Sequence, residues 1–357
     1  MISSSADALV INNYFSSYLK SNPNAENIMW AINYSSRAFE SLLSNDVTVN
    51  IPYDLDTNAN NFLGMAGNAT AAVSKDDYFQ ALKGNAAAHP ENTVLAQAIK
   101  DLGQGNYANE NLTKVSASTA LFRANGIPID GYYDTFTNDD GTPAFDLGGE
   151  EIKEGGLDGA VTLASLGEMK FGFDIPAYDE VSGVIWYSAI NTLQHEIMHI
   201  LGGGNSNIGS EDEMESLDMF RYSAPGVPNF GEPGRAYFSI DGGKTEIQEF
   251  YEDFYPNNGK KPGDINGWGP LTPCSTGPGR GGPIGLFMDS SSCSNQPTVT
   301  FNLSSPEGIE LMALGWNPRV AAVPEPATWT MMILGFGGIG AALRRRHPKP
   351  TVRTSFA

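Results

Sequence analysis

Residues 195–199 read HEIMH, and this pentapeptide has the side chains and the spacing of a zinc-binding motif. His195 and His199 are four residues apart, so on a helix both imidazoles leave the same face and can bind one zinc ion. Glu196 lies beside them, where its carboxylate is close enough to accept a proton from a water molecule without replacing a ligand. The motif therefore predicts a catalytic zinc site in which Glu196 is the general base.

The motif is informative because the chain has four histidines in 357 residues. A chance HExxH then has a probability on the order of one in a few hundred. Apolar residues recur at helical spacing through residues 185–201, as a helix buried in a core requires. The alternative is that His195 and His199 are two hydrogen-bonded histidines of a core helix.

Two histidines hold zinc poorly, so a third protein ligand is needed. The glycines at 202–204 end the helix and let the chain reverse, so the third ligand is expected a modest distance downstream. Asn205 comes first, but a neutral amide oxygen is a poor zinc ligand. The acidic stretch SEDEMES, residues 210–216, has the charge density of a solvated loop.

Asp218 is the predicted third ligand, because it is set in the apolar context LDMF, where a buried carboxylate needs a partner. Glu215 is the next candidate among the carboxylates. The alternative for Asp218 is a role within the fold, as a helix cap or as the ion-pair partner of Arg221.

Two parts of the sequence resemble known metalloproteases. HEIMHILG is similar to the zincin helix, and its glycine resembles that of the metzincin pattern HExxHxxGxxH, although Asn205 stands in place of the last histidine. The third ligand is then His89, a carboxylate or a neutral oxygen. The stretches 217–226, 236–245 and 310–316 resemble an exported metalloprotease family that carries a PEP-CTERM tail. The resemblance implies a zincin-like fold and zinc-dependent hydrolysis of peptide bonds.

The C-terminal stretch 324–346 combines a Pro-Glu-Pro triplet, an apolar run at 329–343 and three arginines. Fifteen helical residues span about 22 Å, less than the roughly 30 Å of a bilayer core. The order of these parts resembles the PEP-CTERM sorting signal of Gram-negative bacteria. The resemblance implies export, transient membrane insertion through 329–343 and cleavage by an exosortase; the alternative is a plain membrane anchor. Residues 1–15 have no signal-peptide pattern.

The net charge of −20 argues against a nucleic-acid binder, which needs a basic face to neutralise phosphates. Cys274 and Cys293 lie in a segment rich in glycine, proline and serine and predict one disulfide. Closing a loop of about 20 residues, it would contribute roughly 3 kcal/mol. The alternative is two free thiols.

Periodicity and turn residues predict the other elements. We expect helices at 24–45, 74–83, 91–102 and 306–316, strands at 47–51, 159–166, 236–241 and 298–303, and turn-rich chain at 104–160. The strand at 159–166 is a candidate edge strand for binding an extended substrate by strand addition. Within the turn-rich chain, residues 137–151 could bind a cation, although a solvated loop is favoured.

These observations predict an α+β, zincin-like domain over residues 1–320, with a mixed twisted sheet above the HExxH helix. Its α/β part extends to about residue 204, and the loop-rich part at 205–320 supplies the third ligand. A sorting tail follows at 321–357. The predicted function is a zinc endopeptidase acting on proteins or peptides, with any calcium requirement open. The alternative is a surface or biofilm matrix protein whose metal site is structural or inactive.

Overall fold

The computed structural model describes most of the first 320 residues and three residues of the tail. The described residues are 8–59, 62–102, 111–132, 146–176, 182–204, 212–229, 235–250, 288, 294, 295, 297–320, 334, 336 and 339. The chain divides into two compact units, residues 1–319 and 320–357. In the described part of the chain, no helix has the length and apolar character that a membrane crossing needs.

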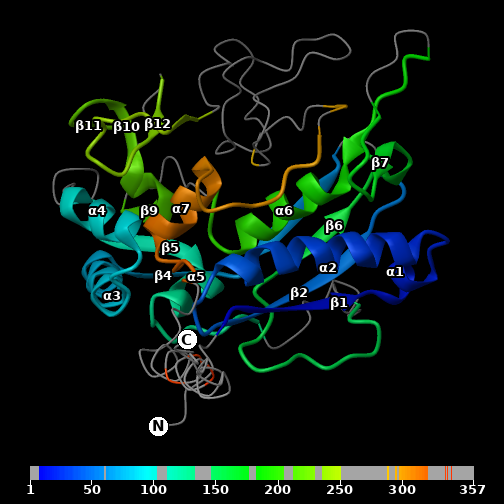
Figure 1. The fold of residues 1–357 in the computed structure, drawn as a ribbon, viewed down its shortest axis with the longest axis horizontal. Helices are drawn as coiled ribbons and strands as arrows, with labels where there is room; N and C mark the ends of the chain where they lie inside the picture. The colour runs from blue at the N-terminus through cyan, green and yellow to red at the C-terminus, as the bar shows by residue number, and fades with distance from the viewer. Residues whose placement is uncertain are drawn as a thin grey trace, which may run out of the picture. The chain divides into compact units, whose positions relative to one another are not determined.

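The main sheet has four strands in the order β1 (Val10–Phe15), β2 (Thr48–Leu55), β6 (Gly159–Leu163) and β3 (Gly64–Asn68). Figure 1 labels β1, β2 and β6. The first three run parallel, and β3 is antiparallel to β6. The prediction that residues 159–166 form an edge strand is therefore wrong: they form a strand, but it is paired on both sides. Among the described strands, β3 is the edge beside β6.

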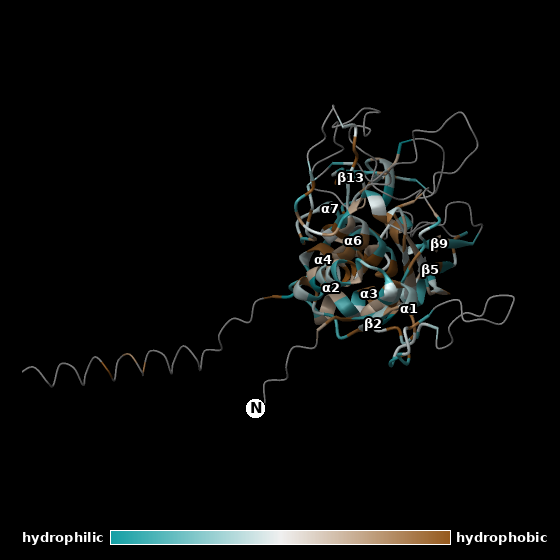
Figure 2. Cartoon of the chain, turned by 90° about the vertical axis from the view of Figure 1, so that its right-hand side faces the viewer, coloured by the Kyte–Doolittle hydropathy of each residue, from teal (hydrophilic) through white to brown (hydrophobic). Residues whose placement is uncertain are grey.

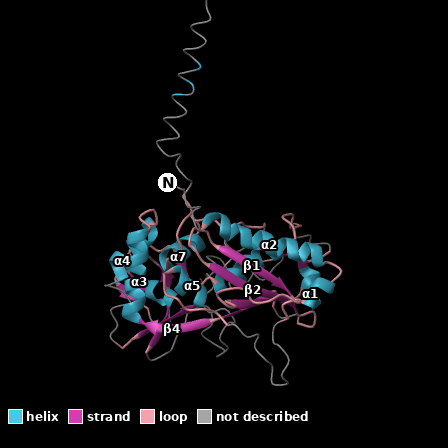
Figure 3. Cartoon of the chain, turned by 90° about the horizontal axis from the view of Figure 1, so that it is seen from below, coloured by secondary structure: helices cyan, strands magenta, loops and turns pink. Residues whose placement is uncertain are grey.

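Two helices cover the same face of this sheet. α2 (Ala25–Leu42) packs on β1, α6 (Ala189–Ile200) packs on β6 and β3, and the two helices pack on each other. Figure 3 shows α2 along one face of β1 and β2. Figure 2 shows hydrophobic residues, in brown, gathered around α6 in the interior. The HEIMH segment is thus carried by a helix within the core.

The remaining elements surround this two-layer unit. They are α1 (Ser17–Ser21), β4 (Thr70–Ser74), α3 (Lys75–Ala88), α4 (Thr93–Leu102), β5 (Lys114–Ser118), α5 (Thr119–Ala124), η2 (Leu166–Glu168), β7 (Met169–Lys170), β8 (Tyr187–Ser188), β9 (Glu213–Glu215), η3 (Ser216–Phe220), β10 (Arg221–Ala224), β11 (Val227–Pro228), β12 (Tyr237–Phe238), β13 (Gln248–Glu249) and α7 (Pro306–Leu314). β4, β5 and β9 form a second sheet, and β10 to β13 form a third.

The α+β class and the main helices agree with the sequence predictions. α2, α3, α4 and α7 lie where amphipathic spacing and capping residues indicated helices. Residues 104–160 were expected to be turn-rich, and no element was assigned there, but β5 and α5 lie in this range. Both are short, and their small buried residues, such as Ser116 and Ala120, carry little periodic signal.

Residues 298–303 were predicted as a strand, but they form extended chain without a strand partner among the described residues. Side-chain amides of α6 take the place of that partner. The N–H of Val299 donates to Asn191 Oδ1 at 2.7 Å, and the N–H of Phe301 donates to Gln194 Oε1 at 2.6 Å. Gln194 Nε2 in turn donates to the Val299 carbonyl at 2.6 Å. The segment satisfies its backbone against a helix instead of a sheet.

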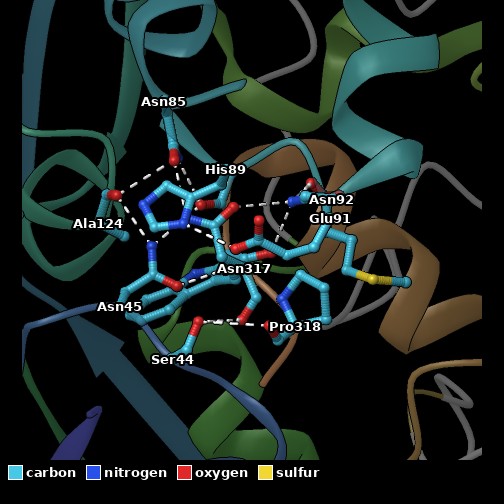
Figure 4. Close-up of polar contacts among 12 residues, drawn as sticks. Ser44, Asn45, Asn85, His89, Glu91, Asn92, Ala124, Asn317 and Pro318 are labelled. Atoms are coloured by element: carbon cyan, nitrogen blue, oxygen red, sulfur yellow. Dashed lines mark hydrogen bonds and ion pairs between the residues drawn. The ribbon is translucent and has the colours of Figure 1, made fainter. Parts of the chain in front are cut away.

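Buried asparagines fix the chain that follows α7 (Figure 4). Asn85 Nδ2 donates to the Gly315 carbonyl at 2.7 Å, and Asn45 Nδ2 donates to the same carbonyl at 3.1 Å. Asn317 Nδ2 donates to Asn85 Oδ1 at 2.7 Å, and Asn92 Nδ2 donates to Asn317 Oδ1 at 3.0 Å. All four asparagines are buried. This asparagine network ties the end of α7 to α3 and to the chain before α4.

Candidate functional site

α6 begins and ends at well-defined positions. The Ser188 side chain caps its N-terminus by accepting from the Asn191 N–H at 3.2 Å. The helix ends at Ile200, as the glycine run predicted, and Gly202 then adopts a φ of +96°. Ten of its twelve residues are buried. The polar side chains on this helix are therefore held in fixed directions by the core.

The two histidines converge. Nε2 of His195 and Nε2 of His199 are 3.0 Å apart. Two nitrogens bound to one tetrahedral zinc at about 2.0–2.1 Å would lie about 3.3 Å apart, so the pair is close to the separation that one cation needs. At 3.0 Å the two nitrogens are also within hydrogen-bond distance of each other. His199 Nδ1 lies 3.1 Å from the carbonyl oxygen of Gly203. Because a carbonyl only accepts, Nδ1 carries the proton and Nε2 presents its lone pair to the site.

Glu196 is 6 % exposed and lies against the edge strand β3. A Cβ at Gly64 would lie 2.8 Å from Glu196 Oε1 and 2.7 Å from Thr192 Cγ2. Glycine at this position therefore lets β3 cross directly over the carboxylate. We did not predict this residue; the signal available was a glycine inside a short strand, which often marks a close approach.

The glycine turn after α6 is packed tightly around His199. A Cβ at Gly203 would lie 2.7 Å from Met198 Cγ. Gly204 has a φ of +66°, and a Cβ there would lie 2.9 Å from His199 Cε1. Larger residues would push the turn away from the imidazole. The glycines thus follow the end of the helix, as predicted, and they leave room for the backbone of the turn beside His199.

The structure does not bring Asp218, the predicted third ligand, to the histidine pair. Among the described residues, no group of three His, Cys, Asp or Glu side chains is placed to hold a metal ion. Asp218 Oδ2 instead accepts from the Glu215 N–H at 3.0 Å, within a capping box at the start of η3. This is the capping role that the sequence left open for Asp218.

Two other candidates also lie in different surroundings. Burial raises the pKa of Glu215 to about 7, and the neighbouring carboxylates of Asp218 and Glu213 add to the shift. His89 follows α3, and its Nδ1 lies 3.0 Å from Glu91 Oε1 (Figure 4). Neither Glu215 nor His89 joins the histidine pair in a group that could hold a metal in the described part.

Several predicted features lie outside the described residues. They are Asn205, Cys274, Cys293, most of residues 137–151 and nearly all of the tail at 324–346. Within 137–151, Asp146 is described, and its Oδ2 accepts from the Ser17 N–H at 2.7 Å, while its Oδ1 accepts from the Gly148 N–H at 2.8 Å.

Comparison with known proteins identifies the tail. Residues 322–346 match the PEP-CTERM protein-sorting motif. The protein is therefore exported and is attached at the cell surface through an exosortase. No curated protein and no solved structure matches the chain.

Proposed function

We propose that residues 1–319 form a zincin-like, zinc-dependent endopeptidase whose site is built on α6. The observation that carries the proposal is the convergence of His195 Nε2 and His199 Nε2, 3.0 Å apart, beside the buried carboxyl of Glu196. Two imidazoles one turn apart with a carboxylate between them are the arrangement that metal-assisted hydrolysis requires. A decayed site has no need for Glu196.

His195 and His199 would hold the metal through Nε2, the nitrogen that the Gly203 carbonyl leaves unprotonated in His199. A bound zinc ion would supply Lewis-acid chemistry, polarising a carbonyl group and lowering the pKa of water. Glu196 accepts the proton of the attacking water and later donates it to the leaving amine. The burial of Glu196 keeps this carboxyl oriented between α6 and β3.

An extended peptide would bind along β3. Among the described strands β3 is the sheet edge, so its outer backbone groups are those available for strand addition. Gly64 places this edge within contact distance of Glu196, so a peptide paired there passes next to the general base. β3 thus takes the role that was predicted for residues 159–166.

The proposal requires a third ligand and does not use Asp218, whose carboxylate is engaged in the capping box. Asn205 directly follows the glycine turn in sequence and stands at the position of the metzincin histidine. Whether Asn205 is the third ligand can be tested by comparing the zinc stoichiometry of Asn205→Ala with that of Asp218→Ala. Loss of zinc in one variant and not in the other identifies the ligand.

The deciding experiment is casein cleavage by the purified protein, with and without a chelator. We expect activity that chelation abolishes and zinc restores. Glu196→Gln should keep its zinc while activity falls at least about a hundredfold, because a general base contributes rate and a ligand contributes affinity. His195→Ala should lose both.

Zinc bound by a wild-type protein that cleaves nothing would instead support the matrix protein with a structural or inactive site. Wild-type protein that binds no zinc would overturn the proposal.

A further inference from the structure

One peptide group links His199 to a buried carboxyl group on another helix. The carbonyl of Gly203 accepts from His199 Nδ1 at 3.1 Å. The N–H of the same peptide group, that of Gly204, donates to Glu310 Oε1 at 2.7 Å. The Gly203–Gly204 peptide is therefore hydrogen bonded at both ends, to the imidazole on one side and to the carboxyl on the other.

Glu310 is fully buried on α7. Burial raises its pKa to about 8, and the neighbouring Glu307 carboxyl adds to the shift while the bond from Gly204 opposes it. Its second oxygen, Oε2, has no hydrogen-bond partner among the described residues. Burying a carboxyl group with only one hydrogen-bonded oxygen costs free energy. This cost suggests that the hydrogen bond from the Gly204 N–H to Oε1 has a function.

Hydrogen bonds hold the C-terminal end of α7, the helix that carries Glu310. The asparagine network holds the chain just after α7, and Asn92 Nδ2 also donates to the Met312 carbonyl at 3.1 Å. Trp316 Nε1 donates to the Leu201 carbonyl at 2.9 Å, on the other side of the glycine turn. Glu310 and Trp316 therefore hold the glycine turn from both sides, through Gly204 and Leu201.

We propose that Glu310 is a positioning residue for His199. By accepting from the Gly204 N–H, it fixes and polarises the peptide group whose carbonyl accepts from His199 Nδ1. Partners of this kind hold a ligand histidine in one tautomer and orientation and raise its basicity. Glu310 thereby keeps the Nε2 lone pair of His199 directed into the site. The inference rests on the proposed function where it concerns metal affinity, but the tautomer itself does not require a metal.

The test compares Glu310→Ala, Glu310→Met and Glu310→Gln. The control is Glu307→Gln, because Glu307 is equally buried one turn earlier on α7 and accepts from the Met288 N–H rather than from the glycine turn. The first readout is the ¹⁵N shifts of the His199 imidazole in metal-free protein, which report the tautomer. The second is zinc affinity, measured by competition with a chromophoric chelator.

We expect Glu310→Ala and Glu310→Met to lose the single Nδ1–H tautomer and to bind zinc about 10- to 100-fold more weakly. Glu310→Gln keeps an oxygen acceptor at the same place, so it should retain the tautomer and bind zinc within about threefold of wild type. The Glu307→Gln control should match wild type in both readouts. The methionine variant fills the volume of the glutamate and decides the test should the alanine variant fail to fold.

A single Nδ1–H tautomer and unchanged zinc affinity in Glu310→Met would overturn the inference. Equal losses in Glu307→Gln and Glu310→Gln would also overturn it, because they would reflect disturbance of α7 as a whole. If wild-type protein binds no zinc, the proposed function fails, and the ¹⁵N shifts of the metal-free variants still decide whether Glu310 positions His199.

Discussion

Gly64 of β3 lies against Glu196 of α6, so closely that a Cβ at Gly64 would be 2.8 Å from Glu196 Oε1. The edge strand and the carboxylate are therefore a single packed unit. A peptide paired along β3 would therefore lie next to the Glu196 carboxyl, the proposed general base. Because of this contact, even the methyl group of an alanine at position 64 would collide with Glu196.

Gly64→Ala should reduce kcat/KM for casein at least about tenfold, because the new methyl group must displace either β3 or the Glu196 carboxylate. Gly67→Ala is the matched control on the same strand, since a Cβ there meets no atom within 4 Å. Zinc content should be normal in both variants. Equal activity in the two variants would show that β3 and Glu196 do not work together.

Asp218→Ala should destabilise the protein by about 1 kcal/mol through loss of the cap, while zinc per folded molecule stays at the wild-type value. Urea unfolding gives the first quantity and metal analysis of the folded fraction gives the second. Loss of zinc from well-folded Asp218→Ala would restore Asp218 as the third ligand.

Stability should fall as the pH rises, in part because of Glu310. Its folded pKa is about 8, against an ordinary value of 4.5, so the folded state holds this proton more tightly. The stability contributed by the neutral form is complete below about pH 4.5 and is lost as the pH rises through 8. Glu310→Gln removes this titration, so its stability relative to wild type should increase between pH 5 and pH 9. Urea unfolding at both values measures the difference, and an unchanged difference would contradict the shifted pKa.

The mature exported protein should lack everything from about Ala327 onward, because the Pro-Glu-Pro triplet precedes the apolar run in the matched sorting motif. Intact-mass spectrometry of protein recovered from the cell surface measures this. Detection of residues 329–346 in that protein would mean that the tail remains as an anchor.

The sequence predicted the helix at HEIMH and the approach of its two imidazoles, because two histidines four residues apart lie on one face of a helix. The edge strand β3 was missed because GMAGN has two glycines and no regular apolar alternation, and its place depends on packing against α6 rather than on local preference. A single sequence does not reveal such a packing partner.

Asp218 shows why a correct burial prediction does not identify a ligand. Its apolar neighbours correctly indicated burial, since Asp218 is 5 % exposed. The required partner was a backbone N–H three residues away, which a short turn supplies at lower cost than a metal. Residues 298–303 illustrate the same limit: their alternation predicted a strand, but the partners are side chains of α6.

The asparagine network also sets a mechanical limit on sorting. Asn317 is held by buried hydrogen bonds, and the Pro-Glu-Pro triplet begins seven residues later, at Pro324. Seven residues span at most about 25 Å when fully extended, so the Pro-Glu-Pro triplet stays within that distance of Asn317. A pull on the tail reaches the bonds around Gly315 and Asn317 before it reaches α6. A body drawn toward the membrane by its end would therefore first load the links to α3 and to the chain before α4, and Trp316 would pass part of that load to Leu201 at the end of α6.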